Sequence, residues 1–274
     1  MIELFSERGL AQLEALSRTR ALYAFDFDGT LAEIVRERDH AKLRSEVRQA
    51  LHDLGRLAPT AVISGRALED LRSRIDGTVP YLIGNHGLEG TPDETTVRDQ
   101  ARIVSRSWRE QLGASLAQLH DEGITLEDKT YSLTLHFRGT RNSALARRKA
   151  KEALSRLTPA PRIIQGKGVV NAVPAGSPDK GAAIRSLMHH LNTTTALYVG
   201  DDETDEDVFA LPDASMVTVR IGKKRDSCAQ FYLADQEQVA RLLADLVERL
   251  STRSSPHTIG ESPGVMTAGR PVAR

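Results

Sequence analysis

Apolar and polar positions follow two patterns along this chain, and the two patterns predict two kinds of structure. From Ala21 to Gly84, and again after Pro174, short apolar runs that suit buried strands alternate with stretches of helical periodicity. Strands separated by helices are typical of βαβ units and a parallel sheet. The elements expected here are strands at 21–25, 60–63, 195–199 and 216–221, and helices over 1–20, 67–75 and 236–250 and from 180 and 203.

The stretch from Val97 to Val173 has a different pattern. Its expected elements are helices over 97–122 and 142–157, strands at 124–128 and 131–137, and a hairpin of 162–165 with 169–173 that turns at Gly166-Lys167-Gly168. Helices and hairpins in this order predict an α+β insert in an α/β protein.

This change of pattern predicts the domain organisation. Residues 1–95 and 175–250 are expected to form an α/β core, and residues 96–174 an inserted α+β lid that closes over a site at the strand ends. An accessory domain that only stabilises the core is the alternative for the insert. Residues 251–274 are rich in Ser, Thr, Gly and Pro, and we expect them to be disordered.

Composition excludes several classes of function. Lys plus Arg and Asp plus Glu both total 37, and this balance argues against a basic nucleic-acid-binding surface. The single Cys228 excludes an intrachain disulfide framework. No apolar run approaches the roughly 18 residues of a membrane span, and the first residues lack the layout of a signal peptide. We therefore expect a monomeric, cytoplasmic protein that binds neither nucleic acid nor membrane.

Two aspartates stand directly after the first predicted strand. Asp26 and Asp28 follow the apolar run 21–25, and Gly29 permits a sharp turn. In such a turn the two carboxylates converge on a small volume, where they repel each other unless a cation lies between them. A surface turn with two solvated acids is the alternative interpretation.

A second group of acids stands after a second strand. Asp201, Asp202, Glu203, Asp205, Glu206 and Asp207 follow the apolar run 195–199. Acids that complement the dipole at a helix N-terminus account for part of this run. In open α/β sheets, however, ligands bind outside the carboxyl ends of the strands. Two strands tipped with acids predict a site of oxygen ligands that suits Mg²⁺.

Two more signals favour an anion site. Ser64, Gly65 and Arg66 follow the strand at 60–63 and open a helical pattern, so a hydroxyl and helix N–H groups are available to an anion. Lys180 lies in the first turn of a predicted helix, where the dipole disfavours a lysine unless it meets a negative group. Taken alone, the first signal also fits a simple N-cap and the second a surface lysine.

Together and in this order, the four signals resemble the haloacid-dehalogenase-like (HAD) phosphatase superfamily. More narrowly, the chain is similar to the trehalose-6-phosphate phosphatase family over roughly residues 20–235. The stretches that carry this narrower resemblance are Gly84–Glu89, Glu127–Lys129, Leu135–Arg138, Gly166–Val170 and Gly200–Asp207. The resemblance implies a Rossmann-like parallel sheet core with an inserted C2-type α+β cap.

The resemblance also implies a reaction, the Mg²⁺-dependent hydrolysis of trehalose 6-phosphate through an aspartyl-phosphate. In that reaction Asp26 is the nucleophile and Asp28 the general acid and base. Mg²⁺ is held by Asp26, Asp201 and the backbone carbonyl of Asp28, while Asp205 orients a metal-bound water or Lys180. The implied phosphate-binding residues are Ser64, Gly65 and Lys180.

For the sugar, the resemblance implies Glu127, Lys129 and Asn171 from the lid. From the core it implies either His86 or Glu89, and Arg66 is a substrate-binding candidate that reaches the phosphate. Glu127 and Lys129 also fit solvated charges at a strand end, and Arg66 also fits a partner for an acid such as Glu69. His136 is interpreted as a partly buried histidine satisfied by its neighbours.

One departure leaves the sugar open. The family tends to carry a glutamate, then a basic residue with proline, where this chain has Asn171-Ala172-Val173-Pro174. A phosphatase for glucosylglycerol phosphate or a mannosyl phosphate is therefore an alternative, and a phosphomutase uses the same aspartyl chemistry. A silent sugar-phosphate sensor, or a regulatory partner of a sugar synthase, is disfavoured because Asp26, Asp28, Lys180 and Asp201 are all present.

Overall fold

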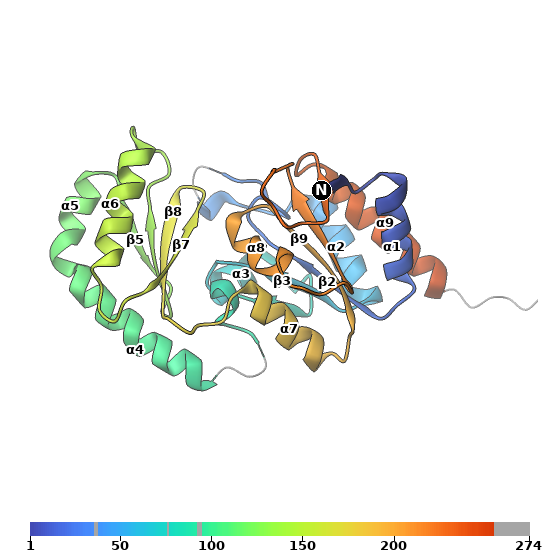
Figure 1. The fold of residues 1–274 in the computed structure, drawn as a ribbon, viewed down its shortest axis with the longest axis horizontal. Helices are drawn as coiled ribbons and strands as arrows, with labels where there is room; N and C mark the ends of the chain where they lie inside the picture. Colours follow the sequence, from blue (N-terminus) through green and yellow to red (C-terminus); the bar gives the residue numbers. More distant parts are fainter. Residues whose placement is uncertain (36–37, 76, 92–94, 255–274) are drawn as a thin grey trace, which may run out of the picture.

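Seven strands form a parallel sheet in the larger part of the molecule (Figure 1). The structure is a computed structural model, and it describes residues 1–35, 38–75, 77–91 and 95–254. Within these ranges the strand order is β1-β11-β10-β9-β2-β3-β4, and every neighbouring pair is parallel. The strands are β1 (Ile2–Glu3), β2 (Ala21–Phe25), β3 (Thr60–Ile63), β4 (Tyr81–Ile83), β9 (Thr195–Gly200), β10 (Met216–Ile221) and β11 (Phe231–Leu233).

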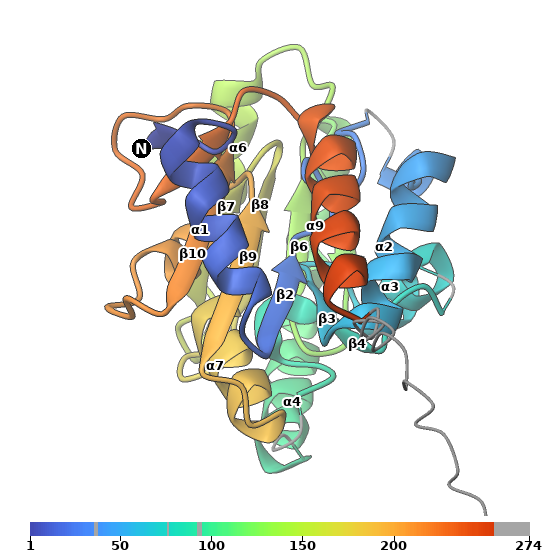
Figure 2. The same ribbon diagram turned by 90° about the vertical axis from the view of Figure 1, so that its right-hand side faces the viewer.

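Helices cover both faces of this sheet, so its central strands are buried on both sides. In β2, Tyr23 and Phe25 join one hydrophobic cluster, while Leu22 and Ala24 join the other. The first cluster packs under α1 (Glu7–Ser17), α2 (Ser45–Leu57), α3 (Leu68–Ile75) and α9 (Gln238–Ser254). The second packs under α7 (Lys180–His190) and α8 (Glu206–Phe209). Figure 2 shows α1, α9 and α2 together on one face of the sheet.

A second, antiparallel sheet forms the cap. Its strands β5 (Thr125–Asp128), β6 (Leu133–His136), β7 (Arg162–Gly166) and β8 (Val169–Val173) lie in the order β5-β6-β8-β7. The cap helices are α4 (Thr95–Leu112), α5 (Leu116–Asp121) and α6 (Ser143–Ser155). Figure 1 shows α5 and α6 on the side of this sheet that is turned away from the larger sheet. The apolar cluster beneath these helices includes Trp108, Leu135 and Leu154.

The architecture confirms the predicted fold class, with some differences in the elements. The helix expected over 97–122 is interrupted, because α4 ends at Leu112 and a 3₁₀ turn, Gly113–Ser115, precedes α5. Glycine is a poor helix former, so this break is physically reasonable. The short strands β1, at one edge of the sheet, and β11, next to it, were not expected. Helix α9 continues to Ser254, and the rest of the predicted tail, 255–274, lies outside the described residues.

Within the described ranges, each helix is either too short or too polar to span a bilayer.

Candidate active site

The carboxyl ends of three neighbouring strands meet at one edge of the parallel sheet. Asp26 follows β2, Ser64 follows β3 and Asp201 follows β9, and β2 lies between the other two strands. The amide of Asp26 donates to the carbonyl of Val199 at 2.8 Å, which fixes the register of the two acid-tipped strands. This edge is where open α/β sheets bind ligands.

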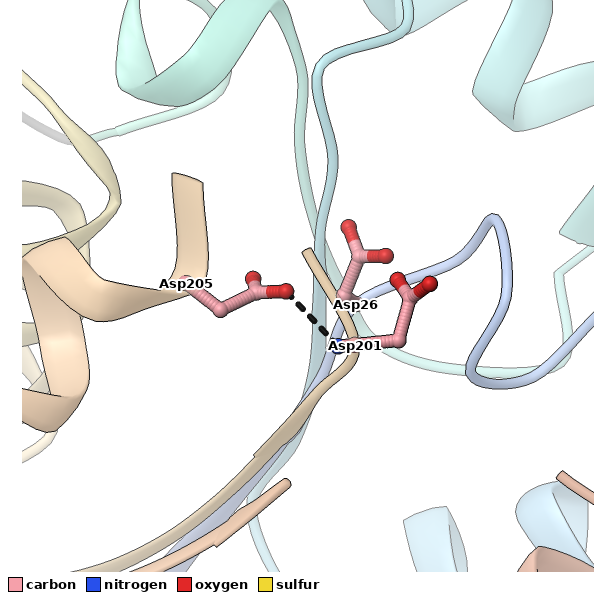
Figure 3. A group of neighbouring side chains, drawn as sticks. All are labelled: Asp26, Asp201 and Asp205. Atoms are coloured by element: carbon pink, nitrogen blue, oxygen red, sulfur yellow. Dashed lines mark hydrogen bonds between the residues drawn. The ribbon is translucent and has the colours of Figure 1, made fainter. Parts of the chain in front are cut away.

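Three buried carboxylates converge at this edge. Oxygen atoms of Asp26, Asp201 and Asp205 all lie within 4.8 Å of one another. Figure 3 shows the carboxylates of Asp26 and Asp201 side by side, with Asp205 approaching from the opposite side. The Oδ1 atom of Asp201 is buried and has no hydrogen-bond partner in the described part of the chain. A group made only of carboxylate oxygens, one of them unpartnered, fits a hard divalent cation.

Asp205 is held in place more firmly than the other two acids. Its Oδ2 accepts from the backbone amides of Asp201 and Asp202, both at 2.8 Å. Its Oδ1 accepts from Lys180 at 2.8 Å and from the Tyr198 hydroxyl at 2.6 Å. Burial raises the pKa of Asp205, but Lys180 and these hydrogen bonds outweigh burial and lower it. Asp205 is therefore a fixed anion that orients its neighbours.

Lys180 bridges two members of this acidic group, Asp26 and Asp205. It is the first residue of α7, its side chain is 2% exposed, and its Nζ lies 2.6 Å from Asp26 Oδ1. Burial lowers the pKa of Lys180, but the charges of Asp205 and Asp26 outweigh burial and raise this pKa above its usual value. The ammonium therefore stays charged. The pKa of Asp26 is raised by burial and by its two acidic neighbours despite Lys180. Lys180 thus ties Asp26 to Asp205 within a crowded group of acids.

The cap reaches this acidic group through Lys167. This residue lies in the turn between β7 and β8, and its Nζ donates to Asp201 Oδ2. Burial and Asp205 raise the pKa of Asp201, and the lysine partly offsets them, so the pKa is about 6. The contact brings the antiparallel sheet to the strand ends of the parallel one. Lys167 was not among the predicted site residues, although its motif was noted.

Asp28 lies outside the acidic group. Its carboxylate accepts from Arg66 through both oxygens, at 2.6 and 2.7 Å. The buried Arg66 guanidinium also donates to Asp70 at 2.7 Å, and Asp70 in turn accepts from Arg74. The structure therefore pairs Arg66 with Asp28 and Asp70. Pairing with an acid was the alternative considered for Arg66, although the acid named was Glu69.

Asp70 gives the Arg66 network a pH dependence. Burial raises the pKa of Asp70, but hydrogen bonds from Arg74 and Arg66 lower it well below its usual range. We expect Asp70→Asn to lower the free energy of unfolding by about 1 kcal/mol at neutral pH. Because the folded pKa is depressed, this stabilisation is present above the unfolded value and is lost as the pH falls through about 4 and below.

Urea unfolding of wild type and Asp70→Asn across this pH range measures the effect. Asp99→Asn is the control, because Asp99 pairs with Arg102 at the surface, where both side chains are more than half exposed. A stability difference that does not shrink in acid would contradict the role given to the Asp70 carboxylate.

The residues after β3 form the other side of the site. The buried Ser64 hydroxyl accepts from the backbone amide of Arg66 at 3.2 Å, and the carbonyl of Gly65 accepts from Lys129 Nζ at 2.7 Å. The ring of His86 packs against Gly65, where a Cβ would lie 2.5 Å from Cε1. Burial, then the charges of Lys129 and Lys180, lower the pKa of His86 well below its usual range, so its imidazole is neutral.

A cavity of about 610 Å³ lies between the two sheets. The predicted site residues that line it are Asp26, Asp28, Ser64, Gly65, Arg66, His86, Glu127, Lys129, Asn171, Lys180 and Asp201. Asp205 is buried behind these lining residues and does not itself line the cavity. Glu89, the alternative to His86, is also absent from the lining, and its carboxylate accepts from the Leu68 amide and from Asn85.

Three further residues line the cavity, although the sequence did not assign them to the site. Thr134, His136 and Arg138 come from one cap strand and the residues after it, and they face the cavity. Their spacing of two residues is the signal that was available, because alternate side chains of a strand share a face. Tyr198, which supports Asp205 from inside the sheet, had no such signal.

Comparisons with known proteins find relatives of the chain both in sequence and in fold. The sequence model of the family described as Trehalose-phosphatase matches residues 24–237. The chain is 31% identical over 260 residues to the "Trehalose-phosphate phosphatase" of Mycobacterium ulcerans, covering 89% of this chain and 66% of that protein. It thus spans about two thirds of the length of that relative.

Two solved structures show the same fold. The "Crystal structure of trehalose-6-phosphate phosphatase related protein" has a TM-score of 0.72 at 21% identity, covering 86% of this chain and all of that one. A putative HAD/COF-like hydrolase from Plasmodium vivax has a TM-score of 0.58 at 17% identity, covering 86% of this chain and 98% of that one. The fold is that of the HAD-like hydrolases, and the chain belongs to the trehalose-phosphatase family.

Proposed function

We propose that this protein is a Mg²⁺-dependent phosphatase that hydrolyses trehalose 6-phosphate to trehalose and phosphate, as a step of trehalose biosynthesis. The observation that carries the proposal is the meeting of Asp26 and Ser64, at adjacent strand ends, with Lys180 at the start of α7. They line a cavity whose opposite wall is a polar cap sheet. Family membership supports the choice of substrate. The cytoplasmic location and the monomeric state stay predictions from the sequence.

The residues present fit a bound Mg²⁺. Asp26 and Asp201 are the carboxylates that would hold it, together with the backbone carbonyl of Asp28, and Asp205 would orient the group from behind. The unpartnered Asp201 Oδ1 and the close approach of three buried carboxylates support this choice. When bound, the ion neutralises the charge that otherwise keeps an anionic nucleophile away from a phosphate ester.

In the first step, a carboxylate oxygen of Asp26 forms a bond to phosphorus while the bond from phosphorus to the sugar oxygen breaks. The leaving oxygen takes a proton from the Asp28 carboxyl. Lys180 and the Ser64 hydroxyl bind the phosphoryl oxygens, where negative charge is held in the transition state. The products of this step are the free sugar and an aspartyl-phosphate at Asp26.

In the second step, water attacks the phosphorus and Asp28 accepts a proton from it, releasing phosphate and the Asp26 carboxylate. The paired state of Asp28 bears on both steps. Two hydrogen bonds from Arg66 occupy both oxygens of the Asp28 carboxylate. The first step needs the protonated form, so we propose that Asp28 leaves Arg66 when the ester is bound.

The cap supplies the sugar-binding side of the cavity. Glu127, Lys129 and Asn171 offer a carboxylate, an ammonium and an amide to a ligand with many hydroxyl groups. We propose the division of the chain into a core of 1–95 and 175–250 and a cap of 96–174, so that phosphate chemistry and sugar selection fall to different parts of the chain. Asn171 is a neutral group where the family tends to carry an acid. The choice of sugar is therefore best tested by comparing several sugar phosphates as substrates.

Phosphate release by the full chain tests the proposal. We expect release from trehalose 6-phosphate to exceed that from glucose 6-phosphate and glucosylglycerol phosphate, to stop with a chelator and to return with Mg²⁺. Faster release from another sugar phosphate would keep the reaction and change the substrate. Binding of trehalose 6-phosphate without release would favour a sensor, and the absence of both would contradict the proposal.

A further inference from the structure

The cap contributes one carboxylate to the lining of the cavity, among the described residues, and it belongs to Glu127. The other acids of the lining come from the core. Carboxylates accept hydrogen bonds from sugar hydroxyl groups, and a charged acceptor makes stronger hydrogen bonds than a neutral one. The position of this one carboxylate therefore has a large effect on which sugar the cap can bind.

A second cap residue fixes the Glu127 carboxylate. The Nε2 atom of His136 lies 2.6 Å from Glu127 Oε2. The two residues are diagonal neighbours on one face of the sheet, because Glu127 stands opposite Thr134 and His136 is two residues further along β6. Since an ionised carboxylate only accepts, Nε2 carries the proton in this contact. Both side chains are about one quarter exposed or less and border the cavity.

The neighbouring polar pair on the same face is already satisfied within the sheet. The Thr134 hydroxyl donates to Asn171 Oδ1 at 2.6 Å, and Asn171 Nδ2 donates to the carbonyl of Ile164 at 3.3 Å. Asn171 is buried. Its amide is thus engaged at both ends, and it offers less to a ligand than its position in the cavity wall suggests.

We propose that His136 is a positioning residue that orients the Glu127 carboxylate for hydrogen bonds with sugar hydroxyl groups, so that this pair selects hydroxyl-rich phosphate esters. The inference rests on the proposed phosphatase function and adds a specificity determinant to it. His136 itself acts through Glu127. It contributes to binding of the sugar and leaves the transfer of the phosphoryl group to the core.

Steady-state kinetics with two substrates test this role. In His136→Ala we expect KM for trehalose 6-phosphate to rise about tenfold or more, the loss typical of a hydrogen bond to a charged group, with kcat changed less than threefold. Hydrolysis of p-nitrophenyl phosphate, which has no hydroxyl groups for the cap to bind, should be unchanged. His136→Gln should restore much of the affinity, because its amide can donate to the same carboxylate.

A double-variant cycle separates positioning from a general loss of structure. If His136 acts through Glu127, the pair Glu127→Gln and His136→Ala should raise KM no more than Glu127→Gln alone. Asp128→Asn is the matched control: it is the next residue of the same strand, but its carboxylate pairs with Arg109 and does not line the cavity. Its KM should equal that of wild type.

Each outcome decides the inference. Additive effects of the two variants, equal losses with both substrates, or no change of KM in His136→Ala would overturn it. Calorimetric binding of trehalose 6-phosphate to Asp26→Asn, with and without His136→Ala, provides a readout free of turnover, and equal affinities would also overturn it. Failure of the proposed function is distinguished beforehand, because wild type would then release no phosphate from trehalose 6-phosphate.

Discussion

Replacement of Asp26 by Asn is expected to lower the rate of phosphate release by about 10⁴-fold or more, the scale of loss when a covalent nucleophile is removed. An amide oxygen is a far weaker nucleophile than a carboxylate. The amide still fits the site, where Lys180 Nζ donates to Oδ1 of the native side chain at 2.6 Å. The loss should therefore appear in kcat with the fold intact, as judged by thermal unfolding.

The control for this variant is Asp213→Asn. Asp213 is an exposed loop residue, and its carboxylate accepts hydrogen bonds from the amide and the hydroxyl of Ser215. The activity of Asp213→Asn should match that of wild type. Asp26→Asn retaining activity within tenfold of wild type would contradict the assignment of Asp26 as the nucleophile.

Replacement of Lys180 by Met should affect both stability and activity. The lysine is buried between Asp26 and Asp205, at 2.6 and 2.8 Å. Removing one partner of a buried ion pair leaves uncompensated charge, and we expect the free energy of unfolding to fall by about 3–5 kcal/mol. Phosphate release should fall to background as well, because no ammonium remains to bind the phosphoryl oxygens.

A second substitution separates the two effects. In Lys180→Met with Asp205→Asn, one unpaired charge is gone, so part of the lost stability should return while activity stays absent. Urea unfolding in the presence of a chelator measures the stability of both variants. An unchanged unfolding midpoint in Lys180→Met would contradict the account of the buried charges.

The sequence was most informative where a short apolar run ends in a polar residue. Asp26, Ser64 and Asp201 each follow such a run, and parallel strands bring their carboxyl ends to one edge, so their meeting could be predicted. Lys180 could be predicted for a related reason, because a lysine in the first turn of a helix is unfavourable unless an anion is near. The cap could be predicted from the change of periodicity after Val97.

The pairing of side chains from distant segments could not be predicted in this way. Arg66 pairs with Asp28, 38 positions away, and this contact depends on the side-chain conformations chosen in the turn after β2. His136 reaches Glu127 only through the register of β5 with β6. Residue types and spacing indicate that such groups share a surface, but the pairing itself depends on which competing partner lies nearest.

Covalent trapping of the phosphoryl group is the most direct test of the proposed chemistry. The full chain would be mixed with trehalose 6-phosphate and Mg²⁺, and quenched during turnover with borohydride, which reduces an acyl phosphate to an alcohol. Mass spectrometry of the digested protein should then find homoserine at position 26, and this product should be absent from Asp26→Asn. Trapping at another residue, or active turnover with no trapped product, would contradict the role of Asp26.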